Sequence, residues 1–230
     1  MVKDVLFDLD DTLCDFKGAR RRGSDLAFAA LPEPCRSEAA QLWRRIEPDL
    51  FRSFAAGEIT REEYRWLRFY MILAQLGQTA PSLIETQGLV RRMNDAFMRE
   101  VNDHAQPTAG AAECLATLRD RGLRCHVLTN GPADSQRRRI RMLGFGTFFA
   151  HVFVGEEIGA FKPDLLAFTT AVRRIGRAPD QVVMIGDDLA GDVLPAREAG
   201  LHAVHYSPAG SGYTPLITHL DQLWDVVAQL

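Results

Sequence analysis

Val5-Leu6-Phe7-Asp8-Leu9-Asp10-Asp11-Thr12 is the stretch that decides the fold. Its three leading apolar residues form a continuous run, which is typical of a strand buried on both faces of a parallel sheet. Side chains alternate along a strand, so Asp8 and Asp10 point to the same side, roughly 7 Å apart. Two carboxylates this close repel each other unless a cation lies between them. The stretch therefore predicts a metal site, although a turn or a helix N-cap would explain Asp11 or Thr12 alone.

The composition is that of an ordinary globular protein, with 230 residues, of which 47% are hydrophobic and 25% charged. No apolar run approaches the roughly 18 residues of a membrane span, and no signal segment is recognisable. The formal net charge of −3 argues against general nucleic-acid binding. We expect a cytoplasmic protein that binds neither membranes nor nucleic acids, and that is a monomer or a homodimer.

Basic runs and histidines give weaker signals. The runs at 137–141 and 173–177 fall in helical stretches and are expected on solvated faces, whereas residues 20–22 could face an anionic substrate. His202 and His205 lie three residues apart on a predicted strand, so they face opposite ways and cannot bind one metal. We expect all six histidines to be structural or exposed.

Helical periodicity extends from Thr12 to about residue 101 without a strand candidate. Thr60 with Glu63 and Ser82 with Glu85 have the spacing of capping boxes, which divides this region into about four helices. The region follows the first strand directly. We therefore predict an inserted all-helical cap at residues 16–98.

From about residue 108, strands alternate with helices. The predicted strands are 125–128, 151–154, 182–185 and 202–205, and helices begin near 134, 163, 189 and 218. This alternation predicts an α/β fold with a doubly wound parallel sheet, Rossmann-like, covered by helices on both faces. The first strand belongs to this sheet, so the core comprises residues 1–15 and 99–230.

Ligands of open parallel sheets collect at the carboxyl ends of the strands. Two predicted strand ends carry groups suited to an oxyanion. Thr129 offers a hydroxyl, and Asn130-Gly131 offers main-chain N–H groups, although a simple turn explains that dipeptide equally well. Lys162 precedes Pro163, which can open the next helix, so its ammonium group is expected at a helix entrance on the same edge.

The strand ending at Gly186 carries further acids, Asp187 and Asp188, with Asp192 beyond them. An N-cap is the structural explanation for Asp188. So many acids at one edge would repel one another strongly without a cation. Because the donors are hard oxygens, with no His or Cys nearby, the pattern predicts Mg²⁺.

In their order and positions, these stretches resemble the four motifs of the haloacid dehalogenase-like (HAD) hydrolase superfamily, and the helical insert is similar to that family's small helical cap. Residues 128–131 with Gln136 and Arg137, and residues 57–60 in the cap, look most like the branch containing pyrimidine 5′-nucleotidases and N-acylneuraminate-9-phosphatases. The resemblance covers the chain from end to end.

The resemblance implies a role for each motif residue. Asp8 is expected to be the nucleophile, and Asp10 the acid that protonates the leaving oxygen and later deprotonates water. Mg²⁺ would be held by Asp8, the main-chain carbonyl of Asp10 and Asp187. The phosphoryl oxygens would be held by Thr129, Asn130 and Lys162. The expected outer residues are Asp192, orienting Lys162 or a metal-bound water, and Asp188.

The predicted function is that of a Mg²⁺-dependent phosphomonoester hydrolase acting through an aspartyl phosphate on a small phosphorylated metabolite, foremost a nucleoside 5′-monophosphate. Alternatives are sugar-phosphate, N-acylneuraminate-9-phosphate or phosphoglycolate-type phosphatases, and a phosphomutase. The acid at position 10 argues against dehalogenation, and the helical insert argues against a receiver that stores the phosphoryl group. Phe54, Trp66 and Phe69 could stack on a base, with packing in the core of the cap as the alternative.

Overall fold

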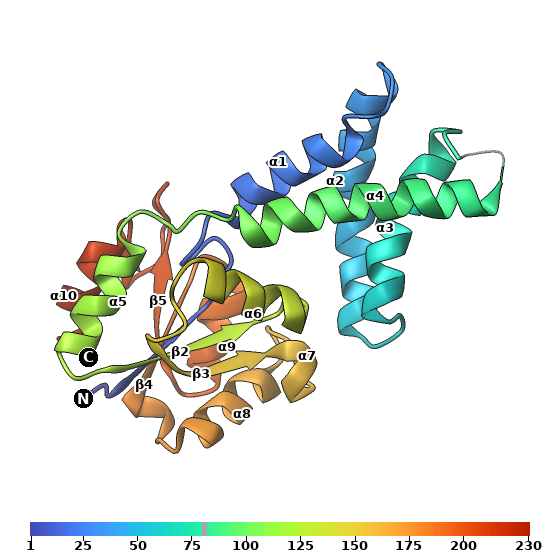
Figure 1. Cartoon of the computed structure of the whole chain (residues 1–230). Helices are drawn as coiled ribbons and strands as arrows, with labels where there is room; N and C mark the ends of the chain where they lie inside the picture. Colours follow the sequence, from blue (N-terminus) through green and yellow to red (C-terminus); the bar gives the residue numbers. More distant parts are fainter. Residues whose placement is uncertain (80–81) are drawn as a thin grey trace. The chain divides into compact units, whose positions relative to one another are not determined.

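Six parallel strands form one sheet in the computed structural model, which describes residues 1–79 and 82–230 (Figure 1). Their order is β3-β2-β1-β4-β5-β6. The strands are β1 (Asp4–Phe7), β2 (Arg124–Thr129), β3 (Phe149–Val154), β4 (Val182–Gly186), β5 (His202–Tyr206) and the short β6 (Leu216–Ile217). The predicted doubly wound α/β fold is confirmed.

The strand order reverses between β1 and β4, which are direct neighbours although β2 and β3 intervene in the chain. Phe7 pairs with Val127 of β2 on one side and with Ile185 of β4 on the other. In open α/β sheets such a switch point leaves a crevice at the carboxyl ends of the strands. The residues that follow Phe7 and Gly186 therefore lie at the place where this fold binds ligands.

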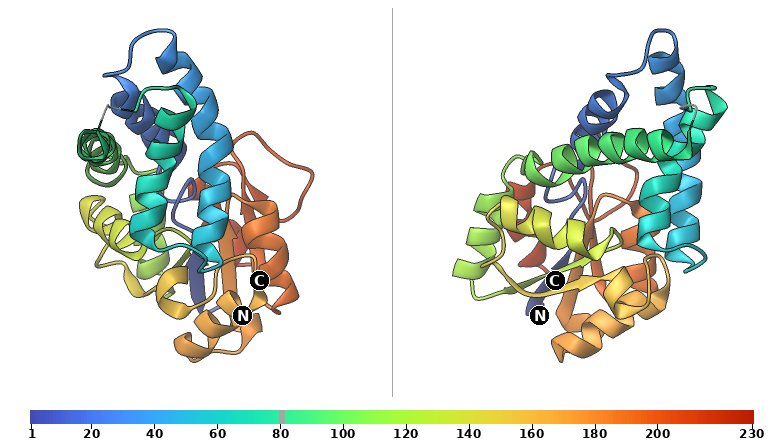
Figure 2. Two further views of the ribbon diagram at one scale, coloured as in Figure 1. Left: turned by 90° about the vertical axis from the view of Figure 1, so that its right-hand side faces the viewer. Right: turned by 45° about the vertical axis from the view of Figure 1, so that its right-hand side comes forward.

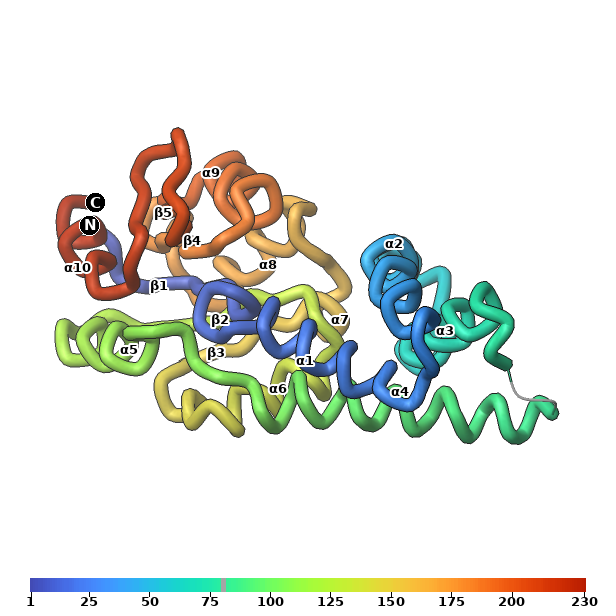
Figure 3. Tube along the Cα trace, turned by 90° about the horizontal axis from the view of Figure 1, so that it is seen from above, coloured from blue at the N-terminus to red at the C-terminus, as the bar shows by residue number. Residues whose placement is uncertain are grey.

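Helices cover both faces of the sheet (Figure 3). Each face has its own apolar core. Side-chain alternation along β1 divides its residues between the two, with Val5 and Phe7 in one core and Leu6 in the other. The first core also contains residues of α5 (Ala111–Asp120), α6 (Ala133–Met142) and α10 (Leu223–Val227). The second contains residues of α8 (Leu165–Ile175) and α9 (Leu194–Glu198).

The helical insert is a compact unit of its own, Lys17–His104, and the remainder, Met1–Phe16 with Ala105–Leu230, is the other unit. The helices of the insert are α1 (Phe16–Phe28), α2 (Cys35–Ala55), α3 (Arg61–Gln75) and α4 (Leu83–Asp103). Helices α2 and α3 pack side by side (Figure 2). The predicted cap ends at residue 98. Because α4 continues unbroken past that residue, the C-terminal boundary of the insert lies at the end of α4.

Local signals in this unit match the sequence closely. Thr60 and Glu63 form the predicted capping box, and the Ser82 hydroxyl accepts a hydrogen bond from the Glu85 N–H. Phe69 is completely buried in an aromatic cluster with Trp43 and other rings. Core packing therefore accounts for this aromatic residue.

Three details of the larger unit differ from the sequence prediction. The short helix α7 (Gly155–Ile158) and strand β6 have too few residues to give a periodic signal. The next helix, α8, begins at Leu165 with Asp164 as its N-cap, so Pro163 lies before the helix and does not open it.

Within residues 1–79 and 82–230, no helix has the length and apolarity needed to span a bilayer.

Candidate active site and metal centre

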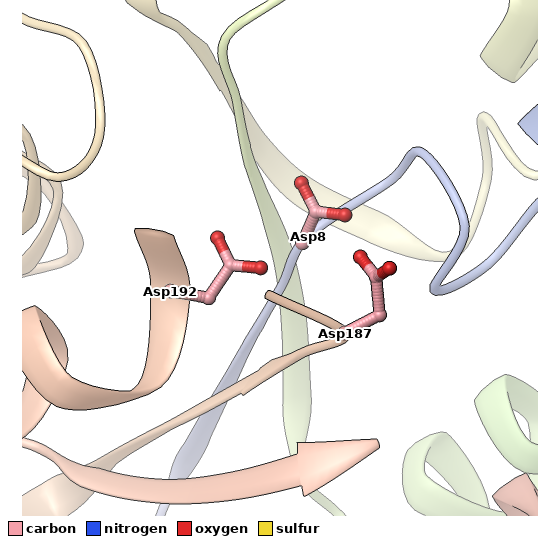
Figure 4. A group of neighbouring side chains, drawn as sticks. All are labelled: Asp8, Asp187 and Asp192. Carbon is pink, nitrogen blue, oxygen red and sulfur yellow. The ribbon is translucent and has the colours of Figure 1, made fainter. Parts of the chain in front are cut away.

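Three carboxylates converge at the carboxyl edge of the sheet, beside the switch point. Asp8 directly follows β1, Asp187 directly follows β4, and Asp192 lies in the π-helical turn η2 (Leu189–Val193) (Figure 4). One oxygen from each residue lies within 4.8 Å of the other two. The adjacency of β1 and β4 thus brings together acids from opposite ends of the chain, at a spacing that one divalent cation can share.

The Lys162 ammonium group pairs with two of these acids. Its Nζ lies 2.6 Å from Oδ1 of Asp8 and 2.7 Å from Oδ1 of Asp192, and all three side chains are buried. Burial disfavours the ammonium charge, but attraction by Asp192 and Asp8 outweighs it and raises the pKa of Lys162 above its ordinary value. Lys162 is therefore a fixed positive charge next to Asp8, the predicted nucleophile.

Burial also determines how the two acids ionise. It raises the pKa of Asp8 well above its ordinary range, with Lys162 opposing the shift and Asp192 and Asp10 adding to it. Burial raises the pKa of Asp192 as well. A second cation beside Asp8, Asp187 and Asp192 would stabilise their ionised forms. Because the converging donors are carboxylate oxygens, the residues fit Mg²⁺.

Asn130 fixes the main chain that carries Lys162. Its Oδ1 accepts a hydrogen bond of 2.7 Å from the Lys162 N–H, and its Nδ2 donates one of 2.6 Å to the Lys162 carbonyl. This reciprocal pair links the end of β2 to the segment before α8. One side-chain N–H of Asn130 is used in this way, so its predicted contact with a phosphoryl oxygen would need the second N–H or the main chain.

Thr12 and His205 hold the main chain of Asp187. The Thr12 hydroxyl accepts a hydrogen bond of 3.1 Å from the Asp187 N–H, which joins the turn after β1 to the end of β4. His205 Nε2 lies 3.0 Å from the Asp187 carbonyl oxygen, to which it donates, and its Nδ1 lies 2.9 Å from Ser211 Oγ. His205 is thus structural, as expected, and it supports the main chain of Asp187, which is a predicted metal ligand.

The Asp10 carboxylate is turned towards α6 and lies outside the three-acid cluster. Its Oδ2 accepts a hydrogen bond of 3.0 Å from Gln136 Nε2, and its Oδ1 forms an ion pair with Arg139. The expectation that the basic run 137–141 lies on a solvated face is wrong for Arg139, which is only 2% exposed. Arg137 does face outwards and pairs with Glu157.

A family model for haloacid dehalogenase-like hydrolases matches residues 2–200. The chain belongs to this family. The predicted membership of the HAD superfamily is thereby confirmed, and the role of each site residue stays a prediction.

Known relatives of this HAD hydrolase include several phosphatases. A glyceraldehyde 3-phosphate phosphatase of Methanothermobacter thermautotrophicus is 30% identical over 210 residues, covering 89% of this chain and 85% of the relative. The pyrimidine 5′-nucleotidase PynA of Streptococcus pneumoniae is 27% identical over 211 residues, covering 90% and 84%. The predicted enzyme class, a HAD-type phosphatase acting on small phosphorylated metabolites, is confirmed at this level.

Solved structures agree on the fold. The magnesium-bound HAD-hydrolase YfnB of Bacillus subtilis superposes with a TM-score of 0.78 at 25% identity, covering 99% of this chain and 100% of YfnB. A 2-haloacid dehalogenase of Pseudomonas syringae superposes with a TM-score of 0.71 at 27% identity, covering 100% and 99%. The HAD fold alone therefore does not separate phosphatases from dehalogenases, and that distinction depends on the site residues.

The remaining predicted residues of the HAD site lie at the same edge. Thr129 is the last residue of β2 and is buried. Asp188 caps η2, its carboxylate accepting a hydrogen bond of 3.0 Å from the Ala190 N–H, while its own N–H donates to Asp192. The Asp188 side chain therefore acts as an N-cap, as the structural explanation expected. A role of Asp188 towards the metal stays a prediction.

Arg139 and His205 contact the HAD site although the sequence analysis did not predict it, and each had a sequence signal. Arg139 lies three residues after Gln136 on α6, so the two share a helix face that Arg137 does not. His205 pairs with Gly186 in the sheet register, which places it beside Asp187. By contrast, Arg20 and Arg22, considered for an anionic substrate, form ion pairs with Glu47 and Glu100 of the helical unit.

Proposed function

We propose that the protein is a Mg²⁺-dependent phosphomonoester hydrolase that works through an aspartyl phosphate on Asp8. The observation that carries this proposal is the buried Asp8 carboxylate, 2.6 Å from the Lys162 ammonium group and grouped with Asp187 and Asp192. A carboxylate fixed between a permanent cation and a metal site is kept ionised and can attack phosphorus. This arrangement suits phosphoryl transfer, in which positioning and charge stabilisation supply most of the catalysis.

In the first step, an Asp8 carboxylate oxygen attacks phosphorus and the bond between phosphorus and the leaving oxygen breaks. Asp10 gives its proton to that oxygen, so the product leaves as an alcohol. In the second step, water attacks the phosphoryl group on Asp8 while Asp10 takes a proton from the water. Inorganic phosphate is released, and Asp8 and Asp10 return to their initial states.

Mg²⁺ would be held by Asp8, Asp187 and the main-chain carbonyl of Asp10, and when bound it would neutralise part of the phosphoryl charge. Lys162, which is held in place by Asp192 and Asn130, is proposed to contact an oxygen of the same phosphoryl group. Thr129, at the end of β2, is proposed to donate its hydroxyl to another phosphoryl oxygen.

For the substrate class we propose nucleoside 5′-monophosphates. The support lies in the helical unit, where Trp66 stacks on Tyr70 with ring centroids 4.2 Å apart and lines a cavity of about 380 Å³. Asn94 and Gln87 also line this cavity, and their amides could read the edge of a base. The stretch 57–60 supports the proposal less, because it ends α2 and caps α3 and so has a structural purpose.

Triose and sugar phosphates are the second candidate class, favoured by the 30% identity to a glyceraldehyde 3-phosphate phosphatase. A screen of phosphate release should compare nucleoside monophosphates with triose, hexose and sialic acid phosphates at equal concentration. We expect the highest kcat/KM for nucleotides, and a Trp66→Leu variant should raise KM for them alone. Equal rates on nucleotides and sugar phosphates would contradict the nucleotide proposal and leave the phosphatase intact.

The phosphatase itself is tested with an aryl phosphate in the presence of Mg²⁺. Asp8→Asn should abolish phosphate release, and Asp10→Asn should reduce it strongly. Asp11→Asn is the matched control, because asparagine tolerates the positive φ of 66° at this position. Chloride release from a 2-haloacid by the wild type, without phosphate release from any ester, would replace the proposal by a dehalogenase.

A further inference from the structure

The carboxylate of Asp10 is held by three donors that belong to the larger structural unit. Gln136 Nε2 donates to Oδ2 at 3.0 Å, the Arg139 guanidinium pairs with Oδ1, and Cys14 Sγ lies 3.6 Å from Oδ1, within the range of a thiol hydrogen bond. Both oxygens are therefore fixed, and the carboxylate cannot rotate without breaking contacts. The Asp10 carboxylate therefore has a defined orientation.

The donors are themselves locked in place. Arg139 is 2% exposed, Gln136 is 1% exposed, and Arg139 donates to Gln136 Oε1 at 3.2 Å. The guanidinium group also lies over the ring of Phe16, 4.2 Å from its centroid. Gln136 crosses so close to Gly131 that a Cβ atom there would lie 1.8 Å from its Nε2. Space for the amide is therefore available only because residue 131 is glycine.

We propose that Gln136 and Arg139 are positioning residues for proton transfer by Asp10. This inference rests on the proposed function, in which Asp10 protonates the leaving oxygen. A carboxylate offers about four lone-pair directions. Arg139 and Cys14 take those of Oδ1 and Gln136 takes one of Oδ2, so the remaining direction lies on Oδ2. The cradle thus selects Oδ2 as the atom that carries the proton to and from the reacting oxygen.

The requirement for such a cradle follows from the reaction. A general acid must be within hydrogen-bond distance of the leaving oxygen and correctly directed, and misplacement of a catalytic group by about 1 Å can cost about 100-fold in rate. Asp10 is 21% exposed on its side chain, so without the cradle water could solvate it in other rotamers. In this proposal, Arg139 and Gln136 affect the reaction rate only by orienting Asp10.

The test is a double-mutant cycle with substrates of different leaving groups. Arg139→Met and Gln136→Met should each lower kcat about 10- to 100-fold on an alkyl phosphate, whose leaving oxygen needs a proton. KM should change by less than about threefold. The loss of kcat should be smaller on an aryl phosphate with an acidic leaving group. In an Asp10→Asn background, neither substitution should lower kcat further. Arg139→Lys should recover part of the loss.

Arg137→Met is the matched control, because Arg137 lies on the same helix but pairs with Glu157 at the surface. It should leave kcat on both substrates unchanged. Thermal unfolding identifies any variant that fails to fold, and Gln136→Met, which changes no charge, then decides the question.

Three results would overturn the inference. Equal losses with and without Asp10 would mean that the residues act independently of it, a rise in KM alone would make Arg139 a substrate ligand, and equal losses on alkyl and aryl phosphates would exclude a role in leaving-group protonation. All three leave the phosphatase proposal standing. A wild type without activity on any phosphate ester would instead refute both.

Discussion

Replacement of Asp4 by asparagine should destabilise the larger unit. Asp4 begins β1 and is completely buried, and its carboxylate lies 2.8 Å from His126 Nε2, from Arg124 and from Arg177. Burial alone would raise the pKa of Asp4, but His126, Arg177 and Arg124 outweigh it and lower the pKa. Asp4→Asn keeps the shape of the side chain and removes the charge on which these contacts depend.

The exposure of the partners sets the magnitude. The side chains of Arg124 and Arg177 are 45% and 37% exposed, so water can replace the carboxylate and each pair contributes about 0–1 kcal/mol. His126 is fully buried, and loss of its charge-assisted hydrogen bond costs about 1.5–3 kcal/mol. The total loss is about 1.5–5 kcal/mol, which lowers Tm by roughly 3–20 °C for a protein of this size.

Denaturant unfolding followed by circular dichroism at pH 7 measures this loss. Asp120→Asn is the control, because Asp120 is 68% exposed and pairs with an exposed Arg119, and its free energy of unfolding should change by less than about 0.5 kcal/mol. If Asp4→Asn were no more destabilising than Asp120→Asn, burial would not be what gives the Asp4 contacts their energy, and the reasoning would be refuted.

The same contacts predict how stability depends on pH. Burial lowers the pKa of His126 from its ordinary value of 6.5, so the folded state favours the neutral ring. His126 contributes its full stability above pH 6.5 and loses it as the pH falls towards the lowered value. The contribution of Asp4, whose pKa is also lowered, is present above its ordinary value of 3.8 and is lost as the pH falls through the folded value. The wild type should therefore lose stability on acidification below pH 6.5.

Three further predictions concern the proposed metal site and the N-cap of α3. Removal of Mg²⁺ with a chelator should abolish phosphate release, and Mg²⁺ should raise Tm in a concentration-dependent way. His205→Ala should weaken Mg²⁺ binding about 10- to 100-fold in the same Tm titration, because the main chain of Asp187 loses its support. Thr60→Ala removes a capping box and should destabilise the helical unit by about 1 kcal/mol in denaturant unfolding, whereas an unchanged midpoint would show that α3 does not need its cap.

The larger features of this protein could be predicted because each has a strong local signal. The buried run before Asp8 and the alternation of strands and helices after residue 108 were sufficient for the sheet. Strand ends were sufficient to place Asp8 and Asp187 at one edge, where they lie close together, and their catalytic roles stay predictions. Spacing along the chain also predicted the capping box at Thr60. These signals depend on a few neighbouring residues, so one sequence contains them completely.

Side-chain partners from distant segments were harder to predict. Asn130 could be placed at a strand end, but its exchange of two hydrogen bonds with the main chain of Lys162 depends on how the segment before α8 folds back. The burial of Arg139 has a similar origin, since an arginine in a basic run is exposed unless a carboxylate such as Asp10 meets it inside. Local charge patterns cannot contain that information.

The two glycines at the strand ends of the site show the same limit in another form. Gly131 was explained equally well as part of a turn, but neither Gly131 nor Gly186 has the positive φ for which turns of types II, I′ and II′ select glycine. Their shared property is the side chain that crosses them. A Cβ at Gly131 would lie 1.8 Å from Gln136 Nε2, and one at Gly186 would lie 2.2 Å from Asp192 Oδ2. Both glycines therefore provide space for groups that orient Asp10 and Lys162, so the same edge of the sheet that collects the acids must also lack side chains of its own at these positions.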